Sequence, residues 1–442
     1  MEINLKQATC LGISSLLLLS GCSTRAPSEK IFNEDNPYQT PNFSVSSYKS
    51  PEKRSTSQRR DVAVAVAISG GGHRAGNFGI GVLKELEKFQ CNQKTFNILN
   101  EIDYFSTVSG GGLAAGLYLS TLHDHIKPPI HTHNSYSLSN LINQNTDNSS
   151  HNLERGYHNT LTRALVSVKA LGNNDRGDFL EKEFDEKILG ADKRNRSLRL
   201  KDIFLDKDNT QEPKLPLWVA NATIYENGSI FPFHPEALRQ YQVTEYTHHL
   251  EKYEINEDYY SLPLAVGLKA SASFPGAVPA TTLKSSTDSV NPFIHLFDGG
   301  LSDNLGVYSA LQMLGDSDQN TKVLIVIDAY NGQPEPFSKQ EGSPTIFQIF
   351  LRTTSISLDA WRIRHKALIE QLSTSNAFNG NKIKVVYLSF DHLPRKLKAQ
   401  VLNIGTNFNI SPAAQQTIFQ AAKHRVNDKG SAIVKAIWGV DC

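Results

Sequence analysis

Apolar residues follow two patterns near the start of the chain, one typical of buried strands and one typical of helices. Residues 62–68 read VAVAVAI and are apolar at every position, which predicts a parallel strand covered on both faces. The next apolar residues recur at three- and four-residue spacing, which predicts the buried face of a helix: Phe78, Val82, Leu86 and Phe89. A glycine-rich stretch joins the two and completes a strand–turn–helix unit.

The same arrangement returns further along the chain. Residues 103–108 (DYFSTV) predict a strand, and LAAGLYL, which follows a second run of glycines, predicts a helix of small residues. Three later segments also predict strands: PFIHLF, KVLIVIDA from Lys322 and IKVVYLSF from Ile383. Ile346 to Leu372 predicts an apolar helix, for which core packing is favoured over contact with lipid. This alternation indicates an α/β fold.

The extreme N-terminus has the pattern of a targeting signal. An apolar run from Ala8 to Leu19 is too short to span a membrane, and it leads into Leu19-Ser20-Gly21-Cys22. This resembles the bacterial lipoprotein signal, in which cleavage precedes the cysteine and the cysteine is lipidated. An ordinary cleaved signal, with no role for Cys22, is the alternative. By the same resemblance, Ser23 favours a lipid-anchored protein of the bacterial cell envelope, in the outer membrane facing the periplasm.

Composition divides the remainder into two parts. Residues 23–60 are polar and predict a disordered tether, whereas residues 61–442 are expected to form one globular domain after the signal of residues 1–22. Lys and Arg number 45 against 44 Asp and Glu, which argues against a broadly basic surface and therefore against a nucleic-acid partner. After removal of the signal and acylation of Cys22, Cys91 and Cys442 remain. A disulfide and two free thiols are both open for them.

The first glycine run predicts an anion site. Residues 69–76 read SGGGHRAG, and consecutive glycines let backbone N–H groups point at an anion near a helix N-terminus. The anion is either a dinucleotide pyrophosphate, since Gly70, Gly72 and Ala75 loosely satisfy G-x-G-x-x-A, or the oxyanion of acyl transfer. A purely structural turn is a third alternative, and the loop alone does not choose among them.

The second glycine run contains a serine. Ser109 lies between a predicted strand and a predicted helix and is followed by glycines, which is the nucleophile-elbow arrangement G-x-S-x-G with Thr107 in place of the first glycine. Asp298-Gly299-Gly300 follows another predicted strand, where open α/β sheets place ligands. Loop, elbow and aspartate together carry more information than any one of them.

That combination resembles the patatin-like phospholipase family from Ser69 to about Gly306. The matching segments are Gly70-Gly71-Gly72-His73-Arg74, the Ser109 elbow, residues 221–233 and 270–279, and Asp298-Gly299-Gly300-Leu301-Ser302-Asp303-Asn304. The resemblance implies a three-layer α/β/α fold with a mainly parallel central sheet, and a serine acyl hydrolase that acts on phospholipids or lysophospholipids without metal or cofactor. It assigns Ser109 as nucleophile, Asp298 as its base, Gly70, Gly71 and Gly72 as the oxyanion hole, and Arg74, Gly111 and Gly299 as support.

Other interpretations remain open from the residues alone. A serine triad would draw its base from His365, His392, His424 or His73. A dinucleotide-binding oxidoreductase would use the Gly70–Ala75 loop, and a non-catalytic envelope lipoprotein would keep the fold for binding. Residues 122–158 carry several histidines, including two H-x-H pairs, but a polar surface insertion is favoured there over a zinc site.

Overall fold

The structure is a computed structural model, and it describes residues 59, 61–126, 176–204, 215–248, 251–255, 258–330, 332, 341–343, 345–374 and 383–442. Residues 40–442 belong to one compact unit. The predicted signal, Cys22, almost all of the predicted tether and most of the histidine-rich segment lie outside the described residues. Within these ranges, no helix is both long and apolar enough to cross a membrane.

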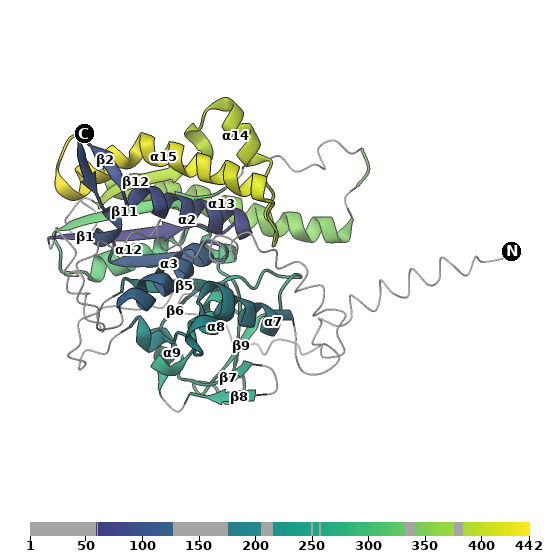
Figure 1. Cartoon of the computed structure of the whole chain (residues 1–442). Coiled ribbons are helices and arrows are strands. Elements are labelled where there is room, and N and C mark those ends of the chain that lie inside the picture. The colour runs from purple at the N-terminus through teal and green to yellow at the C-terminus, as the bar shows by residue number, and fades with distance from the viewer. Residues whose placement is uncertain are drawn as a thin grey trace. The chain divides into compact units, whose positions relative to one another are not determined.

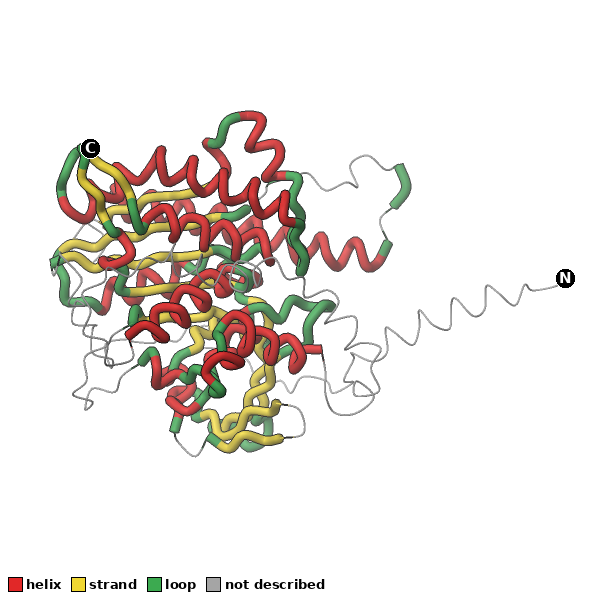
Figure 2. Tube along the Cα trace, viewed as in Figure 1, coloured by secondary structure: helices red, strands yellow, loops and turns green. Residues whose placement is uncertain are grey.

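Ten strands of the described chain form one sheet, in the order β12-β11-β1-β4-β5-β10-β9-β7-β8 with β6 beside β5 (Figures 1 and 2). The strands β12, β11, β1, β4 and β5 are parallel, whereas β10, β9, β7, β8 and β6 pair antiparallel. The bounds are β1 Val62–Ile68, β4 Tyr104–Val108, β5 Leu217–Ile224, β6 Ile230–Phe233, β7 Val243–His248, β8 Glu251–Glu254, β9 Thr281–Ser285, β10 Phe293–Asp298, β11 Thr321–Asp328 and β12 Ile383–Ser389. A separate hairpin joins β2 Phe89–Cys91 to β3 Lys94–Phe96.

Helices cover both faces of the parallel strands, which confirms the three-layer α/β/α fold (Figure 1). α2, α3 and α15 pack together on one face, and α12 and α13 contact the strands from the other. The helices are α2 Gly72–Leu86, α3 Gly111–Ile126, α7 Arg176–Glu183, α8 Ala191–Arg194, α9 Pro235–Gln240, α10 Leu264–Ser271, α11 Gly300–Asp303, α12 Val307–Asp316, α13 Ile346–Thr374, α14 Arg395–Leu402 and α15 Pro412–Trp438. All five predicted strands are present, and four of them are parallel.

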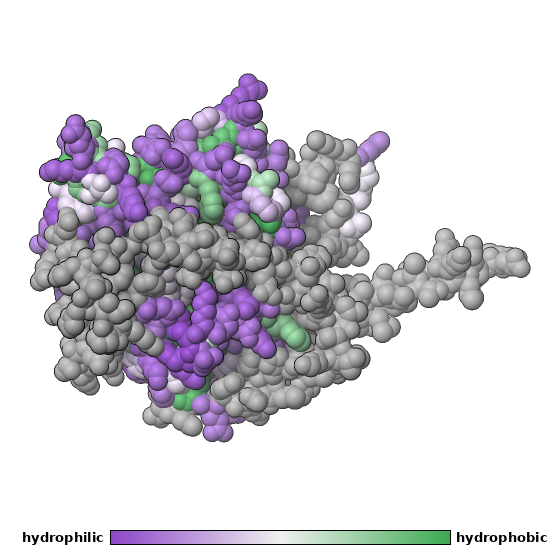
Figure 3. Space-filling view, in the orientation of Figure 1, coloured by the Kyte–Doolittle hydropathy of each residue, from purple (hydrophilic) through white to green (hydrophobic). Residues whose placement is uncertain are grey.

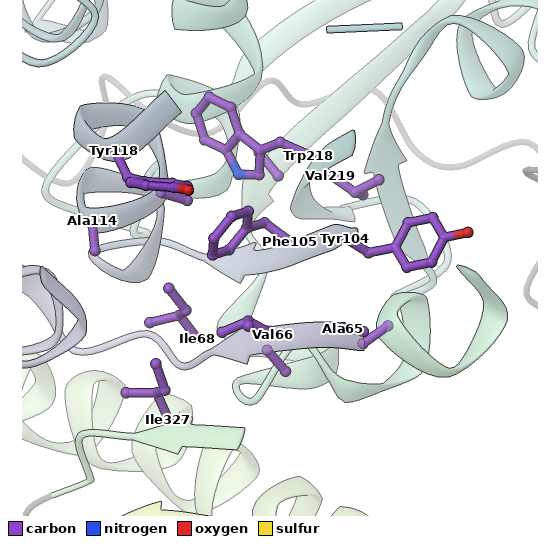
Figure 4. Close-up of a cluster of buried hydrophobic side chains, with 14 of the residues drawn as sticks. Ala65, Val66, Ile68, Tyr104, Phe105, Ala114, Tyr118, Trp218, Val219 and Ile327 are labelled. Atoms are coloured by element: carbon purple, nitrogen blue, oxygen red, sulfur yellow. The ribbon is translucent and has the colours of Figure 1, made fainter. Parts of the chain in front are cut away.

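The core lies where the sequence is most continuously apolar. All seven residues of β1 are buried. α12 packs against the strand, and α2 approaches it closely, since a Cβ on Gly79 would lie 3.2 Å from Ile68 Cγ2. On one side of β4, Phe105 packs edge-on against Tyr118 of α3 and lies near Trp218 of β5 (Figure 4). This buried platform fixes the carboxyl ends of β1 and β4, from which the two glycine runs emerge.

The prediction that Phe89 continues the helix is wrong. α2 ends at Leu86, and Phe89 begins β2, which pairs with β3 around a turn at Asn92 and Gln93. Both turn residues have positive φ, 48° and 63°, as tight hairpin turns require. Phe89 is nevertheless buried, because its ring packs against Gly430 of α15. The apolar spacing therefore identified a core residue but assigned it to the wrong element.

The C-terminus is tied to this hairpin by a disulfide between Cys91 and Cys442. Of the two alternatives that the sequence left open, the structure contains the bond. The two residues are 351 positions apart in sequence and their Cα atoms are 5.0 Å apart. The bond fastens the end of α15 to the segment that follows α2, and α2 and α15 pack against each other.

Replacing Cys442 with serine is expected to destabilise the fold by about 4–5 kcal/mol, because the unfolded chain loses the constraint of a very long loop. Urea denaturation of the oxidised protein and of Cys442→Ser measures the difference. A Cys91→Ser/Cys442→Ser variant is the control and is expected to lose the same amount. Equal stability of oxidised wild type and variant would contradict the expectation.

Candidate active site

Two strands bring the predicted nucleophile and base together. β4 pairs with β5 through Leu217–Asn221, and β10 pairs with β5 through Ala222–Ile224. The Leu217 amide donates to the Asp103 carbonyl, and the Tyr225 amide donates to the His295 carbonyl. Successive amides along a strand point to alternate sides, and these two are an even number of residues apart. β4 and β10 therefore lie on the same side of β5. The two strands run toward each other along that side. Their carboxyl ends meet, and there Ser109 follows β4 and Asp298 ends β10.

Ser109 occupies a strained turn. Its φ is 50°, in the left-handed region that a residue with a Cβ seldom adopts. Its backbone N–H donates to the Oγ of Ser271 at 2.8 Å. The next two residues must be glycine, since a Cβ on Gly110 would lie 2.0 Å from the Gly72 carbonyl oxygen and one on Gly111 would lie 2.5 Å from that of Ile68. The elbow is therefore packed against the first glycine loop.

Thr107 stands where the elbow consensus has glycine, and the structure gives it a partner. Its buried hydroxyl accepts a hydrogen bond of 2.8 Å from the indole N–H of Trp218. Asn221, also on β5, donates its side-chain amide to the Thr107 carbonyl at 3.0 Å and to Ser106 Oγ at 2.9 Å. The departure from consensus thus anchors the strand before the nucleophile to β5.

The Asp298 carboxyl group lies beside the Ser109 hydroxyl, and a hydrogen bond between them is one of the influences on the pKa of Asp298. Its side chain is buried, and Oδ1 also accepts from the backbone N–H of Gly300 at 2.8 Å. Burial raises the pKa of Asp298 to about 6, although the hydrogen bonds from Ser109 and Gly300 act in the opposite direction. A carboxylate in this environment is a stronger base than one in water. Gly299 lets the chain turn here, since its Cβ would lie 2.1 Å from the Asn221 carbonyl oxygen.

The first glycine loop lies beside the elbow, as expected. A Cβ on Gly70 would lie 3.5 Å from the Cβ of Ser109. The three glycines differ, however, in whether their backbone amides already donate a hydrogen bond. The N–H of Gly70 donates to the Asn304 carbonyl at 3.0 Å, whereas the amides of Gly71 and Gly72 find no acceptor among the described residues. Both of these residues have positive φ, 138° and 58°. Gly71 and Gly72 are thus the members of the loop whose amides remain available to an oxyanion.

The side chain of Arg74 ties the first glycine loop to two other segments of the chain. Its guanidinium is almost fully buried and donates to the carbonyls of Ala329 at 2.8 Å and Ile404 at 2.7 Å, and to the Thr406 hydroxyl at 3.0 Å. Burial lowers the pKa of Arg74 to about 10, partly offset by the charge of Asp328, so the side chain stays charged at neutral pH. These contacts make it a clamp between the loop and the segments after β11 and α14. The supporting role expected for Arg74 is therefore to steady the loop.

Sequence reasoning did not single out Ser271 and Ser273 individually. Ser271 accepts from the Ser109 amide, and its carbonyl accepts from the Gly299 amide at 3.3 Å. The carbonyl of Ser273 accepts from the Asp298 amide at 3.0 Å. One short segment therefore fixes both the nucleophile turn and the base. The resemblance at residues 270–279 was the available signal, but it carried no roles for single residues.

The histidines of the alternative triad lie in other surroundings. His365, on α13, has its Nδ1 2.9 Å from Asp303 Oδ1. Burial lowers the pKa of His365, but the hydrogen bond and charge of Asp303 outweigh it and raise the pKa overall. His73 is buried at the start of α2, His392 follows β12 and His424 lies on α15. His295, three residues before Asp298, has its Nδ1 2.5 Å from Glu226.

The geometry contains the parts that acyl transfer needs. A serine hydroxyl on a partly buried turn lies beside a buried carboxyl group, and two backbone amides lie in the adjacent glycine loop. Among the described residues, no cluster of three or more His, Cys, Asp or Glu side chains is suited to hold a metal ion.

A family model described as Patatin-like phospholipase matches residues 66–311, which is more than half of the chain. Both Ser109 and Asp298 fall inside the matched range. Among curated proteins, no relative matches the chain.

Solved structures match this chain at low identity and low TM-score. The human GIVD cytosolic phospholipase A2 is 12% identical with a TM-score of 0.42, covering 85% of this chain and 60% of that chain. Its complex with Methyl gamma-Linolenyl Fluorophosphonate gives 12% identity and a TM-score of 0.42, covering 90% and 63%. VipD from Legionella pneumophila gives 13% identity and a TM-score of 0.25, covering 85% and 67%. This chain spans about three fifths of the length of the human phospholipase.

Proposed function

Because the chain belongs to the patatin-like phospholipase family, a family of lipid hydrolases, we propose that it releases fatty acids from phospholipids or lysophospholipids by serine acyl transfer. Ser109 is the nucleophile and Asp298 its base. The amides of Gly71 and Gly72 form the oxyanion hole, and Gly70 serves to hold the loop to Asn304. The observation that carries the proposal is that the strained Ser109 turn and the buried Asp298 meet where the carboxyl ends of β4 and β10 converge along β5.

The reaction follows from these contacts. Ser109 Oγ attacks the ester carbonyl while its proton passes to the Asp298 carboxylate, and the carbonyl oxygen becomes an oxyanion held by the two glycine amides. The C–O bond to the glycerol side then breaks, and the proton on Asp298 goes to the departing alcohol. Water next attacks the acyl-enzyme and gives its proton to Asp298. Fatty acid leaves as the proton returns to Ser109 Oγ.

The test is fatty-acid release from defined lipids. Phospholipids with different acyl chains at the two ester positions, and the matching lysophospholipids, are incubated with the purified chain, and mass spectrometry identifies the acids released. Release that is blocked by a fluorophosphonate covalently bound to Ser109 supports the proposal. A folded protein that takes up no label and releases no acid from any of these lipids would favour the non-catalytic binding alternative.

We also propose that the chain is exported and anchored by a lipid on Cys22 in the bacterial outer membrane, facing the periplasm. The Leu19–Cys22 pattern supports this, as does the disulfide between Cys91 and Cys442, since such bonds persist in oxidising compartments. The expected result is that the N-terminal peptide of the envelope protein begins at Cys22 and carries the mass of acyl chains. A Cys22→Ser variant is expected to carry no acyl chains at that position, and an unmodified Cys22 peptide from the wild type would contradict the anchor.

A further inference from the structure

α13 is longer than the sheet beside it. Its 29 residues span about 43 Å at 1.5 Å per residue, whereas the eight residues of β11 span about 26 Å. α13 connects the carboxyl end of β11 to the amino end of β12, so its N-terminal part lies at the carboxyl edge of the parallel strands. Figure 1 shows this part of the green helix extending clear of the strands.

The helix also touches the candidate active site. A Cβ on Gly300 would lie 3.0 Å from Leu358 Cδ2 and 3.1 Å from Asp298 Oδ1, so Leu358 packs beside the base. The contact between His365 Nδ1 and Asp303 Oδ1 fixes the next two turns of α13 to α11. The part before Leu358, residues 346–357, therefore extends about 18 Å beyond the level of the dyad, on the edge where Ser109 lies.

The outward face of α13 is apolar. Ile349, Ile356 and Ile363 have exposed fractions of 52%, 52% and 67%. A spacing of seven residues returns a side chain to nearly the same face of a helix, so the three form one line, which we call the isoleucine stripe. Thr353 and Ala360, between them on that face, are exposed too. The stripe contrasts with the mainly hydrophilic described surface that Figure 3 shows.

A line of exposed isoleucines is typical of a surface that binds another molecule or a membrane. Three of the four basic side chains of α13 pair with described carboxylates: Arg352, Arg362 and Lys366. The fourth, Arg364, is the one placed to meet an anionic surface. Arg364, next to the stripe, is exposed over the Trp361 ring at 5.2 Å and forms no ion pair with a described residue. The stripe lies on the same helix as Leu358, which packs beside Asp298. The substrate proposed for that site lies in a bilayer. A second copy of the chain fits less well, because it would cover the edge through which lipid must enter.

We propose that the isoleucine stripe docks on a phospholipid surface and holds the Ser109 edge against it. The proposal rests on the proposed phospholipid hydrolysis, and it assigns the approach to the membrane to α13 in addition to any lipid on Cys22. The predicted core packing of this helix then applies to its inner face, where Leu358 and His365 lie, and not to the face with the stripe.

A fluorescent probe tests docking without relying on activity. The environment-sensitive dye NBD is attached to Ile356→Cys and, as control, to Asn320→Cys at the amino edge of the sheet, in the full chain. Because a lipid on Cys22 would bring every variant to the vesicle, the readout is local polarity. With phosphatidylcholine vesicles containing phosphatidylglycerol, the dye at position 356 is expected to shift to shorter wavelength and the dye at 320 is not.

Two results of the probe experiment would overturn the proposal. The first is an unchanged spectrum at position 356 in the presence of vesicles. The second is a shift without lipid that grows with protein concentration, which would assign the stripe to a second copy of the chain. The dye attached to the wild-type chain gives the background from its other cysteines.

Kinetics give an independent measure. The variant Ile349→Gln/Ile356→Gln/Ile363→Gln keeps helix propensity while removing the apolar line, and Val440→Gln, also an exposed apolar position, is the matched control. The ratio of activity on vesicles to activity on a monomeric short-chain ester is expected to fall about tenfold or more in the triple variant alone. An unchanged ratio would overturn docking. If wild type cleaves neither substrate, the proposed function fails, and the probe still decides docking.

Discussion

Replacing Ser109 with alanine is expected to reduce fatty-acid release at least about 10³-fold, because no other group in the site would form the acyl-enzyme. The fold is expected to remain, since the Ser109 hydroxyl contributes one hydrogen bond to Asp298 while the turn is held by its own amide on Ser271. Release of free acid from a defined phospholipid, measured by mass spectrometry, gives the ratio.

The control for this substitution is a serine outside the site. Ser286→Ala, on the exposed turn after β9, is expected to keep full activity. Fluorophosphonate labelling provides a second readout, because Ser109→Ala should take up none of the label that the wild type takes up. Residual activity above about a tenth of wild type would remove Ser109 as the nucleophile.

Replacing Asp298 with asparagine is expected to lower activity about 10³-fold, because the amide keeps the shape of the carboxyl group but does not accept the Ser109 proton. The pKa of Asp298 is raised to about 6, so wild-type activity should fall about tenfold per pH unit below that value as the base becomes protonated. The measurement is a pH profile of the rate on a soluble ester. Activity retained in Asp298→Asn and lost in a histidine variant would replace the dyad with a triad.

The same substitution is expected to stabilise the protein at high pH. The folded-state pKa of about 6 lies above the ordinary 3.8, so folding disfavours the ionised carboxylate. The resulting destabilisation is absent below pH 4, grows between pH 4 and 6, and is complete above pH 6. At 1.36 kcal/mol per pKa unit, Asp298→Asn should gain up to about 3 kcal/mol at pH 8 and none at pH 4. Urea denaturation at both pH values measures this, and an equal change at both would contradict it.

The elements that carry the site were predictable because their sequence patterns are local. An unbroken apolar heptapeptide such as β1 is typical of a strand covered on both faces, and glycines after it mark the turn into a helix. The pattern failed at Phe89, where a core position belongs to a hairpin and not to α2. Periodicity reports burial, whereas the hairpin depends on backbone angles at Asn92 and Gln93 that apolar spacing does not encode.

The roles within the glycine loop were only partly predictable. Three glycines in a row indicate an anion site, but they are chemically identical in sequence. Only the position of the Asn304 carbonyl shows that the Gly70 amide is already used, which leaves those of Gly71 and Gly72. In the same way, the composition of α13 did not reveal that its isoleucines face outward, because exposure depends on which other elements pack against the helix.

The sequence by itself determined the fold class, the glycine turns, and Ser109 and Asp298 as the pair to examine, because each depends on residues close together in the chain. Only the tertiary structure decided that the carboxyl ends of β10 and β4 meet along β5, which brings Ser109 and Asp298, 189 positions apart, side by side. The tertiary structure also decided that Cys91 pairs with Cys442, and that the amides of Gly71 and Gly72 have no acceptor among the described residues. The physical reason is that strand pairing and burial are set by distant segments, and the pKa of Asp298 follows from that burial.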